Sequence, residues 1–434
     1  MTATQHDKGV GEFPKEFLWG AALSAHACEG CNFHNDWWTW EQRPGRIRDG
    51  STSRQAAWHL RYYPEDFALA RKLGHNAHLF SLEWSRIEPK PGVFDEEALV
   101  HYENVLKALA DNGLEPLCAL HDVTLPRWFA EAGGWTQRRA PEHFTRYVRA
   151  AAERLGPYCR RWIPIRRPMA QWRFGYMEGR WPPGGVAPWR WPRVFRNLLS
   201  GQAQAGAVLR EQIPDARIGL SIECQTHAPF DEESSWDFRA VRREDHLWGG
   251  MVGRGAVEQR WPRMLNPRQD LAPDFLLAAY AGSVTARFQP FRPRHLWTEP
   301  CDADSGEARP PWAMPAPDPA GLEAAVGGLA AFGLPIIVTG CTWSGKDDAK
   351  RCSHLVNTVK ALSEAMESGA RVEGFLYEPF LDSFQWLQGL SQRNGLVYVD
   401  RDSLTRTPQN SAFLLKEIAQ AGGIPPGAAK RFGA

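Results

Sequence analysis

The sequence has almost no excess of charge of either sign. Its 434 residues include 51 Lys and Arg against 50 Asp and Glu, which leaves a formal net charge of +1. Proteins that bind nucleic acid or anionic membranes by electrostatic attraction carry a clear basic excess. The near-balance of charge therefore argues against both kinds of partner.

Long apolar runs and abundant cysteine are also lacking. The first residues, MTATQHDKGVGEFPKEF, contain no hydrophobic stretch, so we expect neither a signal peptide nor a transmembrane segment. We therefore predict a cytoplasmic protein. Only eight cysteines occur in the chain, and without an export signal we expect them to be reduced thiols.

The sequence contains no complete metal-ligand pattern. Cys28 and Cys31 form a single C-x-x-C pair, and no second pair or histidine cluster accompanies it. A structural zinc site normally uses four such ligands. We therefore predict no metal and no other cofactor.

Short apolar segments are present, and they alternate with longer stretches that have helical spacing. The segments predicted as strands are 17–22, 76–82, 116–121, 161–165, 216–222, 294–299, 335–340 and 372–378. Stretches between them, such as 95–113 and 141–156, begin with acidic residues and end on glycine, as helices do. Eight strands alternating with helices predict a single (β/α)8 TIM barrel of the α/β class with elaborated βα loops.

No internal repeat or long linker divides the chain. We predict one barrel domain over residues 12–424, with flexible tails at 1–11 and 425–434. In a barrel of this kind, function resides on the loops that follow the C-terminal ends of the strands. The residues directly after each predicted strand are therefore the ones to examine for chemistry.

Several long motifs stand at or near these strand ends. They include FPKEFLWGAALSAHACEG near the N-terminus, LEWSRIEPKPGVFDEEALVHY, LPRWFAEAGGW, and DSFQWLQGLSQRNGLVYVD near the C-terminus. Together they resemble the motifs of glycoside hydrolase family 1, the β-glucosidase family, from about residue 13 to residue 416. The resemblance implies a TIM barrel and the chemistry of a retaining glycosidase, in which two carboxyl groups act as acid/base and nucleophile.

Both catalytic glutamates that the resemblance implies are replaced. The family carries its acid/base Glu in an NEP motif after the fourth strand, which aligns with Arg166, Arg167 and Pro168. It carries its nucleophile Glu in a TENG motif after the seventh strand, where this chain has Gly340. Arginine cannot donate and recover a proton near neutral pH, because its pKa exceeds about 12. Glycine has no side chain, so we predict that glycosidase activity is absent.

Most other positions that contact sugar in the family have changed as well. By the same resemblance, the family's Gln, His, Arg, Trp, Glu and Asn at these positions align with Ala27, Asp122, Leu79, Glu378, Gln385 and Ala279, while Trp386 is retained. Losing the nucleophile together with its Arg partner is coherent, because either group alone would be a buried, unpaired charge. The pocket has become one in which two Arg face two carboxylates.

From these positions we predict a reshaped, charged pocket. The candidate catalytic residues are Asp122, Glu378, Arg166 and Arg167. One of the carboxylates would move protons, and the guanidinium groups would hold an anionic ligand or developing negative charge. The candidate ligand-binding residues are His26, His121, Tyr280, Gln385, Trp386 and Cys341.

These assignments have structural alternatives. Arg166 and Arg167 can instead pair with Asp122 and fill a collapsed cleft, since buried charges require partners. Glu378 can be a rim carboxylate in water, and Cys341 a small buried apolar residue.

Three functions are open. The favoured one is a repurposed barrel enzyme with acid/base chemistry of lyase, isomerase or cyclase type on a small metabolite, for example in a bacterial biosynthetic pathway. The alternative is a non-catalytic pseudoglycosidase that binds a sugar, a metabolite or a protein partner. A working β-glycosidase is the least favoured, and the sequence contains no indication of the oligomeric state. An open cavity around Asp122 and Glu378 would favour the enzyme, and a collapsed cleft would favour the binding protein.

Overall fold

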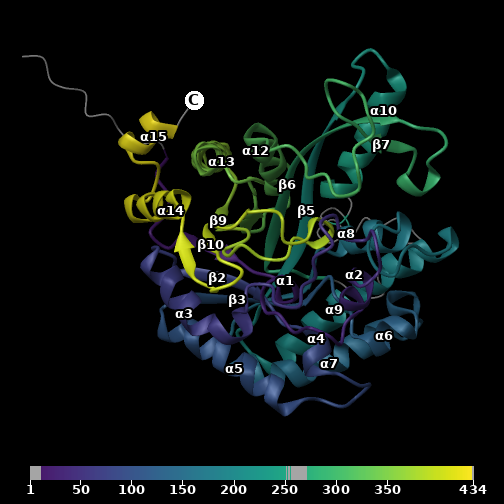
Figure 1. Cartoon of the computed structure of the whole chain (residues 1–434), viewed down its shortest axis with the longest axis vertical. Coiled ribbons are helices and arrows are strands. Elements are labelled where there is room, and N and C mark those ends of the chain that lie inside the picture. Colours follow the sequence, from purple (N-terminus) through teal and green to yellow (C-terminus); the bar gives the residue numbers. More distant parts are fainter. Residues whose placement is uncertain (1–10, 251, 253–254, 256–270, 433–434) are drawn as a thin grey trace, which may run out of the picture.

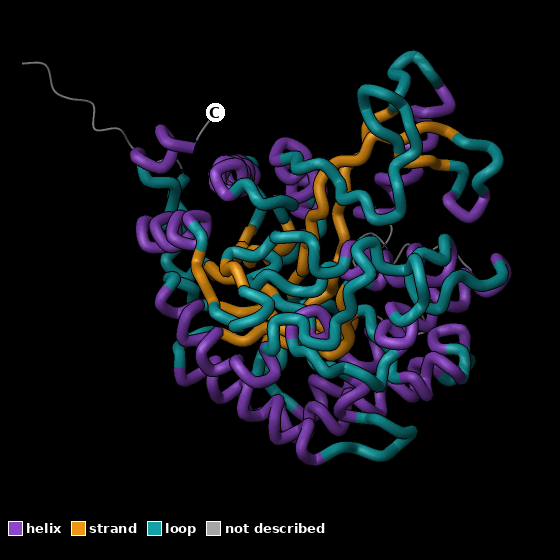
Figure 2. Tube along the Cα trace, in the orientation of Figure 1, coloured by secondary structure: helices purple, strands orange, loops and turns teal. Residues whose placement is uncertain are grey.

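Eight parallel strands form the centre of the structure, a computed structural model that describes residues 11–250, 252, 255 and 271–432. They are β1 (Leu18–Ala22), β2 (Ala77–Ser81), β3 (Glu115–Asp122), β4 (Arg161–Arg166), β5 (Arg217–Pro229), β6 (Phe275–Phe288), β8 (Ile336–Gly340) and β9 (Val372–Tyr377). Each pairs in parallel with the next, and β1 pairs with both β2 and β9, so the sheet closes on itself. Figure 2 shows these strands enclosed by helices. The predicted (β/α)8 barrel is confirmed.

Long helices cover the outside of the barrel (Figure 1). They are α3 (His59–Lys72), α5 (Glu96–Asp111), α7 (Ala140–Leu155), α9 (Trp191–Gln212), α12 (Pro319–Ala330) and α13 (Asp348–Glu367). In α5, the Asp95 side chain accepts a hydrogen bond from the Ala98 backbone N–H and caps the first turn. Its buried residues recur three and four positions apart, so one face of the helix packs on the barrel.

Short helices occupy the loops that follow the strands. They are α1 (Ala25–Cys28), α2 (Asp36–Glu41), α4 (Trp84–Ile87), α6 (Arg127–Glu131) and α8 (Pro168–Ala170). A π-helix at Gln171–Met177 continues directly from α8. These elements build the end of the barrel at which the strands' C-termini lie.

The predicted strand at 294–299 is wrong, because the sixth barrel strand is β6. Residues Pro293–His295 form a short 3-10 helix, and β7 (Thr298–Pro300) pairs antiparallel with the outer half of β6. The inner half of β6, FLLAAY, is rich in Leu and Ala, which favour helices, so its composition concealed a strand. With α10 (Ser235–Asp245), the outer halves of β5 and β6 form the lobe at the upper right of Figure 1.

The C-terminal part of the chain is more structured than expected. A small hairpin pairs β10 (Val397–Val399) with β11 (Arg406–Pro408), and α14 (Asn410–Ala421) follows it. Residues Pro426–Phe432 form α15, with Ala428 buried, where the sequence predicted a flexible tail. Of the predicted N-terminal tail, only Gly11 lies among the described residues.

Apolar side chains fill the barrel below its functional end. This buried cluster consists of Leu18, Ala22, Ala77, Leu79, Leu117, Ala119, Ile163, Phe275, Leu277, Ile337 and Leu376.

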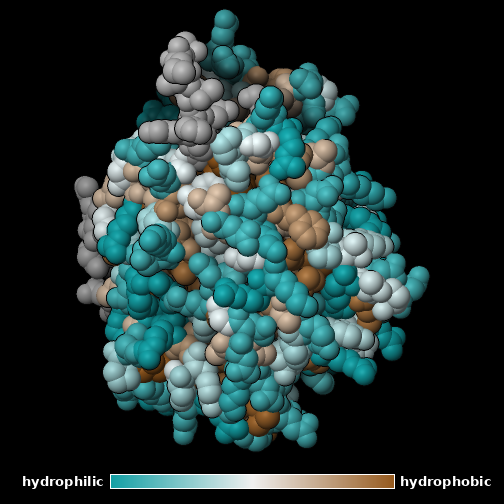
Figure 3. Space-filling model, turned by 90° about the vertical axis from the view of Figure 1, so that its left-hand side faces the viewer, coloured by the Kyte–Doolittle hydropathy of each residue, from teal (hydrophilic) through white to brown (hydrophobic). Residues whose placement is uncertain are grey.

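The outer surface is mostly hydrophilic on the face shown in Figure 3, with hydrophobic residues in small separate spots. Isolated apolar residues of this kind are normal on protein surfaces. Within the described part of the chain, no helix has both the length and the apolar composition needed to span a bilayer.

Two buried histidines, His75 and His78, make the stability of the fold sensitive to acid. Both rings pack against Phe380, and none of their ring nitrogens has a hydrogen-bond partner in the described chain. Burial lowers the pKa of His75 to about 4 and that of His78 well below its ordinary value. Both side chains are therefore neutral in the folded protein at neutral pH.

We expect these histidines to cost stability as the pH falls. The unfolded chain binds protons at both positions below about pH 6.5, while the folded chain does not, so unfolding becomes easier in acid. Between pH 7 and pH 5, His75 alone should lower the free energy of unfolding by on the order of 2 kcal/mol. Urea unfolding at both pH values should show a shallower pH dependence for His75→Leu than for the native protein. An unchanged pH dependence would count against this account.

Candidate functional site

Four charged side chains meet at the C-terminal ends of three strands. Asp122 ends β3, Arg166 and Arg167 lie at the end of β4, and Glu378 follows β9. Arg166 donates from Nη1 to Asp122 Oδ2 (3.1 Å) and from Nη2 to Glu378 Oε2 (2.5 Å). Arg167 donates from Nη1 to Asp122 Oδ1 (3.2 Å) and from Nη2 to Glu378 Oε1. Each carboxylate thus bridges both guanidinium groups, and we call these four residues the charge quartet.

Neighbouring hydroxyl groups add hydrogen bonds to the charge quartet, although Arg166 Nε has no partner in the described chain. Ser24 Oγ, just after β1, donates to Asp122 Oδ2 at 2.7 Å and accepts from both arginines at 3.4 Å. Thr339 Oγ1 on β8 donates to Glu378 Oε2 at 3.4 Å. The structural alternative for the arginines, pairing with Asp122, is thus present in the structure, and Glu378 takes part as well.

The charge quartet is buried unevenly. The side chain of Arg166 is 0% exposed and that of Asp122 is 1% exposed, while Arg167 and Glu378 are each 15% exposed. The four formal charges cancel, as burial in a dry site requires. Only the Arg167–Glu378 side of the charge quartet is open to a molecule that enters from solvent.

The surrounding charges fix the protonation of the two carboxylates. Burial by itself would raise the pKa of Asp122, but the Arg167 and Arg166 guanidinium groups hold this pKa below its ordinary value. For Glu378, burial again opposes the two arginines, and the pKa of the carboxyl is again lowered. Burial would lower the pKa of Arg167, but Asp122 and Glu378 raise it. All three groups are therefore charged at neutral pH and poorly suited to exchange protons.

Gly340, to which the family resemblance assigns the nucleophile position, cannot accept a side chain without backbone movement. Gly340 has a φ of +89°, which is unfavourable for every residue except glycine. A Cβ atom placed there would lie 2.4 Å from the carbonyl oxygen of Tyr280 on the neighbouring strand β6. Leu79, at the position of the family's Arg partner, belongs to the apolar cluster inside the barrel. Glycine at 340 is thus built into the packing of β8 against β6.

The backbone of Arg167 is in an uncommon conformation. Its φ of +56° and ψ of +47° place this non-glycine residue in the left-handed region, directly before α8. Its backbone N–H donates to Ser221 Oγ on β5 at 3.3 Å. Strained positions of this kind are found at binding and active sites, where surrounding contacts hold them. Here the contacts are the two carboxylates and Ser221.

Aromatic rings cluster at the same end of the barrel. Trp386 lies in the loop after β9. Its ring centroid is 5.8 Å from that of His26, in a stacked arrangement, and 4.7 Å from that of Trp37. Trp181, in the loop after β4, stacks on Trp386 at 6.1 Å. His26 is also held by Asn35, at 2.9 Å from its Nδ1 atom. The predicted ligand-binding residues His26 and Trp386 are thus brought together, in a packed aromatic cluster.

Two further predicted ligand-binding residues are engaged in polar contacts of their own. His121 Nε2 lies 2.9 Å from Gln171 Oε1, and burial lowers the pKa of the His121 ring despite this contact. Gln385 donates from Nε2 to Ser383 Oγ at 3.0 Å. His121 directly precedes Asp122 but is not part of the charge quartet.

Tyr280 and Cys341 are not brought to the charge quartet. The Tyr280 hydroxyl donates to the backbone oxygen of Asp318 at the start of α12, on the helix side of the strands. Cys341 lines a very small hollow with Tyr280, Leu322 and His354. Burial raises the pKa of the Cys341 thiol, so it is not a thiolate at neutral pH.

Sequence reasoning missed one carboxyl at this end of the barrel, Glu223. It lies two residues after Ser221 and hence on the same face of β5, which points towards Arg167. Its Oε1 accepts from the Ala170 backbone N–H at 2.8 Å, and its Oε2 has no partner in the described chain. Burial raises the pKa of Glu223 to about 7, although the hydrogen bond from Ala170 opposes this shift. The predicted strand ended at residue 222, so examining the next residue would have found it.

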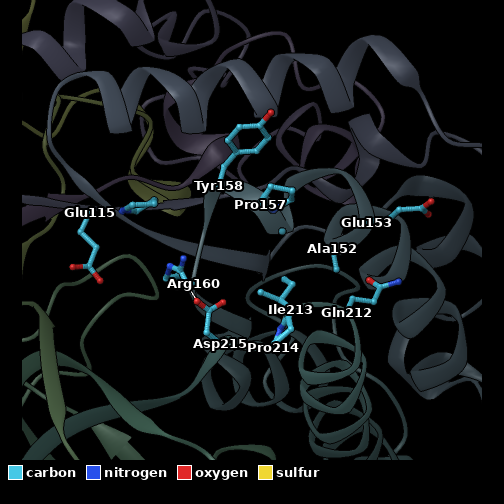
Figure 4. A pocket seen from close by; sticks show the side chains of 12 residues that line it. Glu115, Ala152, Glu153, Pro157, Tyr158, Arg160, Gln212, Ile213, Pro214 and Asp215 are labelled. Carbon is cyan, nitrogen blue, oxygen red and sulfur yellow. Dashed lines mark ion pairs between the residues drawn. The ribbon is translucent and has the colours of Figure 1, made fainter.

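A large hollow of about 740 Å³ lies at the other end of the barrel and has no connection with this chemistry. Figure 4 shows its lining, which includes Glu115, Tyr158, Arg160, Ile213 and Asp215. Arg160 and Asp215 form an ion pair across it. These residues stand where β3, β4 and β5 begin, and that end of a TIM barrel serves stability.

The described residues also contain no group of three or more His, Cys, Asp and Glu arranged to hold a metal ion. All eight cysteines are unpaired in the structure.

The barrel and a polar site at its C-terminal end define a protein of the TIM-barrel class. Residues 10–270 and 335–424 match the family described as Glycosyl hydrolase family 1. The chain therefore belongs to this family. The unmatched residues 271–334 contain β6, the strand that sequence reasoning also failed to place.

Known proteins of this family resemble the chain over nearly its whole length. It is 27% identical to Beta-glucosidase A of Acetivibrio thermocellus, over 95% of this chain and 99% of that protein. It is 26% identical to Beta-glucosidase A of Thermotoga maritima, over 96% and 99% of the two chains. A solved beta-glycosidase from Pyrococcus horikoshii superimposes with a TM-score of 0.88 at 28% identity, covering 98% and 99% of the two chains.

Proposed function

We propose that this chain is a family 1 protein that does not hydrolyse glycosides and that its pocket binds a small molecule bearing an anionic group. One observation carries the proposal: the charge quartet occupies the position at which the family resemblance places the acid/base carboxyl. A retaining glycosidase needs one protonated carboxyl and one free carboxylate about 5–5.5 Å apart. Two arginines, each paired with two carboxylates, cannot take either role.

The same geometry changes which of the first two functions, the acid/base enzyme or the non-catalytic binding protein, is favoured. An acid/base enzyme using Asp122 or Glu378 would need one of them to hold a proton, but Arg166 and Arg167 lower the pKa of both. The aromatic cluster of His26, Trp37, Trp181 and Trp386 packs at the same end of the barrel. These features support a binding protein over a catalyst that works through Asp122 and Glu378.

Arg167 is the group proposed to contact the ligand. It is partly exposed, whereas Arg166 is fully buried, and its partner Glu378 is partly exposed as well. An incoming carboxylate or phosphate could replace Glu378 on the Arg167 guanidinium, whose planar fork suits such groups. Arg166 would then remain paired with Asp122 and keep the site folded.

A second candidate function, a non-hydrolytic acid/base enzyme, is favoured by Glu223 alone. Its carboxyl has a pKa raised to about 7 by burial, which is the range suited to proton transfer at neutral pH. It faces the same side as Arg167, which could hold developing negative charge. In this case Glu223, and not Asp122 or Glu378, would carry the proton.

A matched pair of probes tests the proposed anion site. Gluconate and glucose share a carbon skeleton, but only gluconate carries a carboxylate, so we expect the protein to bind gluconate in preference in calorimetric titration. Arg167→Met should abolish this preference, and Arg167→Lys should weaken it, because a point charge cannot reproduce a bidentate fork. The surface variant Arg149→Met should bind as the native protein does. Equal affinity for both probes, or a preference that survives Arg167→Met, would refute the proposal.

A further inference from the structure

A second hollow lies between the N-terminal turns of α7 and α9. Its volume is about 700 Å³, and its lining consists of Arg138, Arg139, Pro141, Glu142, Arg193, Arg196, Asn197, Ser200 and Gln204. Helix α7 follows the loop after β3, and α9 follows the loop after β4, so the N-terminal ends of both helices lie at the end of the barrel that carries the charge quartet. No residue of the charge quartet lines it, so it is a separate site.

The groove concentrates positive charge in a chain that is almost neutral overall. Four arginines and one glutamate line it, a formal excess of three positive charges, against +1 for the whole protein. Arg139 is paired with Glu142 at 2.6 Å. Arg138, Arg193 and Arg196 form no ion pair or side-chain hydrogen bond with any described residue. Their donors are therefore free to bind an anion.

A hydroxyl that lines the groove has no partner among the described residues. The Ser200 residue is only 7% exposed, and its side chain forms no hydrogen bond within the described part of the chain. A ligand oxygen in the groove would supply the missing partner.

The arginines also stand where they disfavour the helices that carry them. The N-terminus of a helix carries partial positive charge and is stabilised by acidic side chains. Helix α9 has no acidic residue in its first turn, and Arg193 and Arg196 lie near its start. Neither α9 nor α7 has a side-chain hydrogen bond at its N-cap residue, which is Arg190 in α9 and Arg139 in α7. Both the side chains and the helix ends therefore attract an anion.

We propose that this groove binds a small, multiply charged anion of the diphosphate type, either free or as a phosphate ester. The arginine forks match phosphoryl oxygens, and a hollow of about 700 Å³ falls within the usual size of small-molecule sites. The site does not depend on the function of the charge quartet, with which it shares no residue.

Titration with inorganic pyrophosphate tests the site directly. The variant Arg138→Gln/Arg193→Gln/Arg196→Gln should bind pyrophosphate roughly tenfold or more weakly, which is the loss of about 1.4 kcal/mol of binding free energy. The control Arg48→Gln/Arg54→Gln/Arg242→Gln removes the same charge from exposed arginines elsewhere and should bind as the native protein does. Ser200→Ala should also weaken binding. Loss of the arginines should not lower the melting temperature without pyrophosphate, because they disfavour their helices.

Further arms of the experiment identify the source of the anion. Tighter binding of ADP than of pyrophosphate would assign the site to a phosphate ester, and equal binding would assign it to the free diphosphate. Equal losses of affinity in the groove variant and in the control would show that binding depends only on the net charge of the protein. That result would overturn the proposal. Tighter binding of a hexaglutamate peptide than of either phosphate compound would overturn it in favour of an acidic protein partner.

Discussion

Purified protein should release p-nitrophenol from p-nitrophenyl β-D-glucoside no faster than buffer does. Enzymes accelerate reactions by roughly 10⁶-fold to 10¹⁷-fold, and a retaining glycosidase owes this to its two carboxyl groups. Arg167 and Gly340 stand at the positions that the family resemblance assigns to those groups, so we expect nearly the whole acceleration to be lost. Absorbance at high protein concentration over many hours is the measurement.

Traces of a host glycosidase are the main source of error in that assay. A mock preparation from host cells that lack the gene, purified in the same way, reports such contamination, because its rate should equal that of the native protein. Turnover comparable with an ordinary β-glucosidase, and absent from this control, would contradict the expectation. We also expect Arg167→Glu/Gly340→Glu to remain inactive, since a side chain at 340 meets the Tyr280 carbonyl at 2.4 Å.

The second large effect concerns stability. Arg166→Met should lower the free energy of unfolding by about 3–5 kcal/mol, because removing one member of a buried ion pair leaves the other uncompensated. Arg166 is fully buried and bonded to both carboxylates, so no water can replace it. Unfolding in guanidinium chloride, followed by tryptophan fluorescence, measures the change.

Two variants sharpen that measurement. Arg149→Met breaks an exposed ion pair with Glu211 and should cost no more than about 1 kcal/mol. Arg166→Met/Glu378→Gln removes one charge of each sign, so its cost should be clearly smaller than the sum of the two single changes. If the free energy of unfolding of Arg166→Met lies within about 1 kcal/mol of the native value, the charge quartet does not stabilise this end of the barrel.

The barrel could be predicted because its strands and helices differ in local pattern. Seven of the eight predicted strand segments overlap barrel strands, and helices such as α5 have the expected spacing and caps. The failure at 294–299 has a local cause as well, since the Leu and Ala of β6 favour a helix in isolation and form a strand only between β5 and β8.

The site was predictable where it depends on sequence neighbours and not where it depends on barrel closure. Arg166 and Asp122 face each other because β3 and β4 are adjacent, and this pairing was among the alternatives. That Glu378 reaches both arginines follows from the closure of the ring, which no local pattern records, and only the family resemblance placed Glu378 with the arginines and Asp122 in one charged pocket. Tyr280 and Cys341 lie elsewhere because side chains alternate across a strand, and a shift of one residue reverses the face.

The alternation of sign in the charge quartet has a consequence for how fast a ligand can arrive. Two positive and two negative groups that bridge one another form an arrangement without net charge or large dipole, so its electric field decays within a short distance. An anion in solution is therefore not drawn towards the pocket, and it meets Arg167 only on contact with Glu378. Association at this site should be slow and nearly independent of ionic strength, unlike capture by an open basic surface.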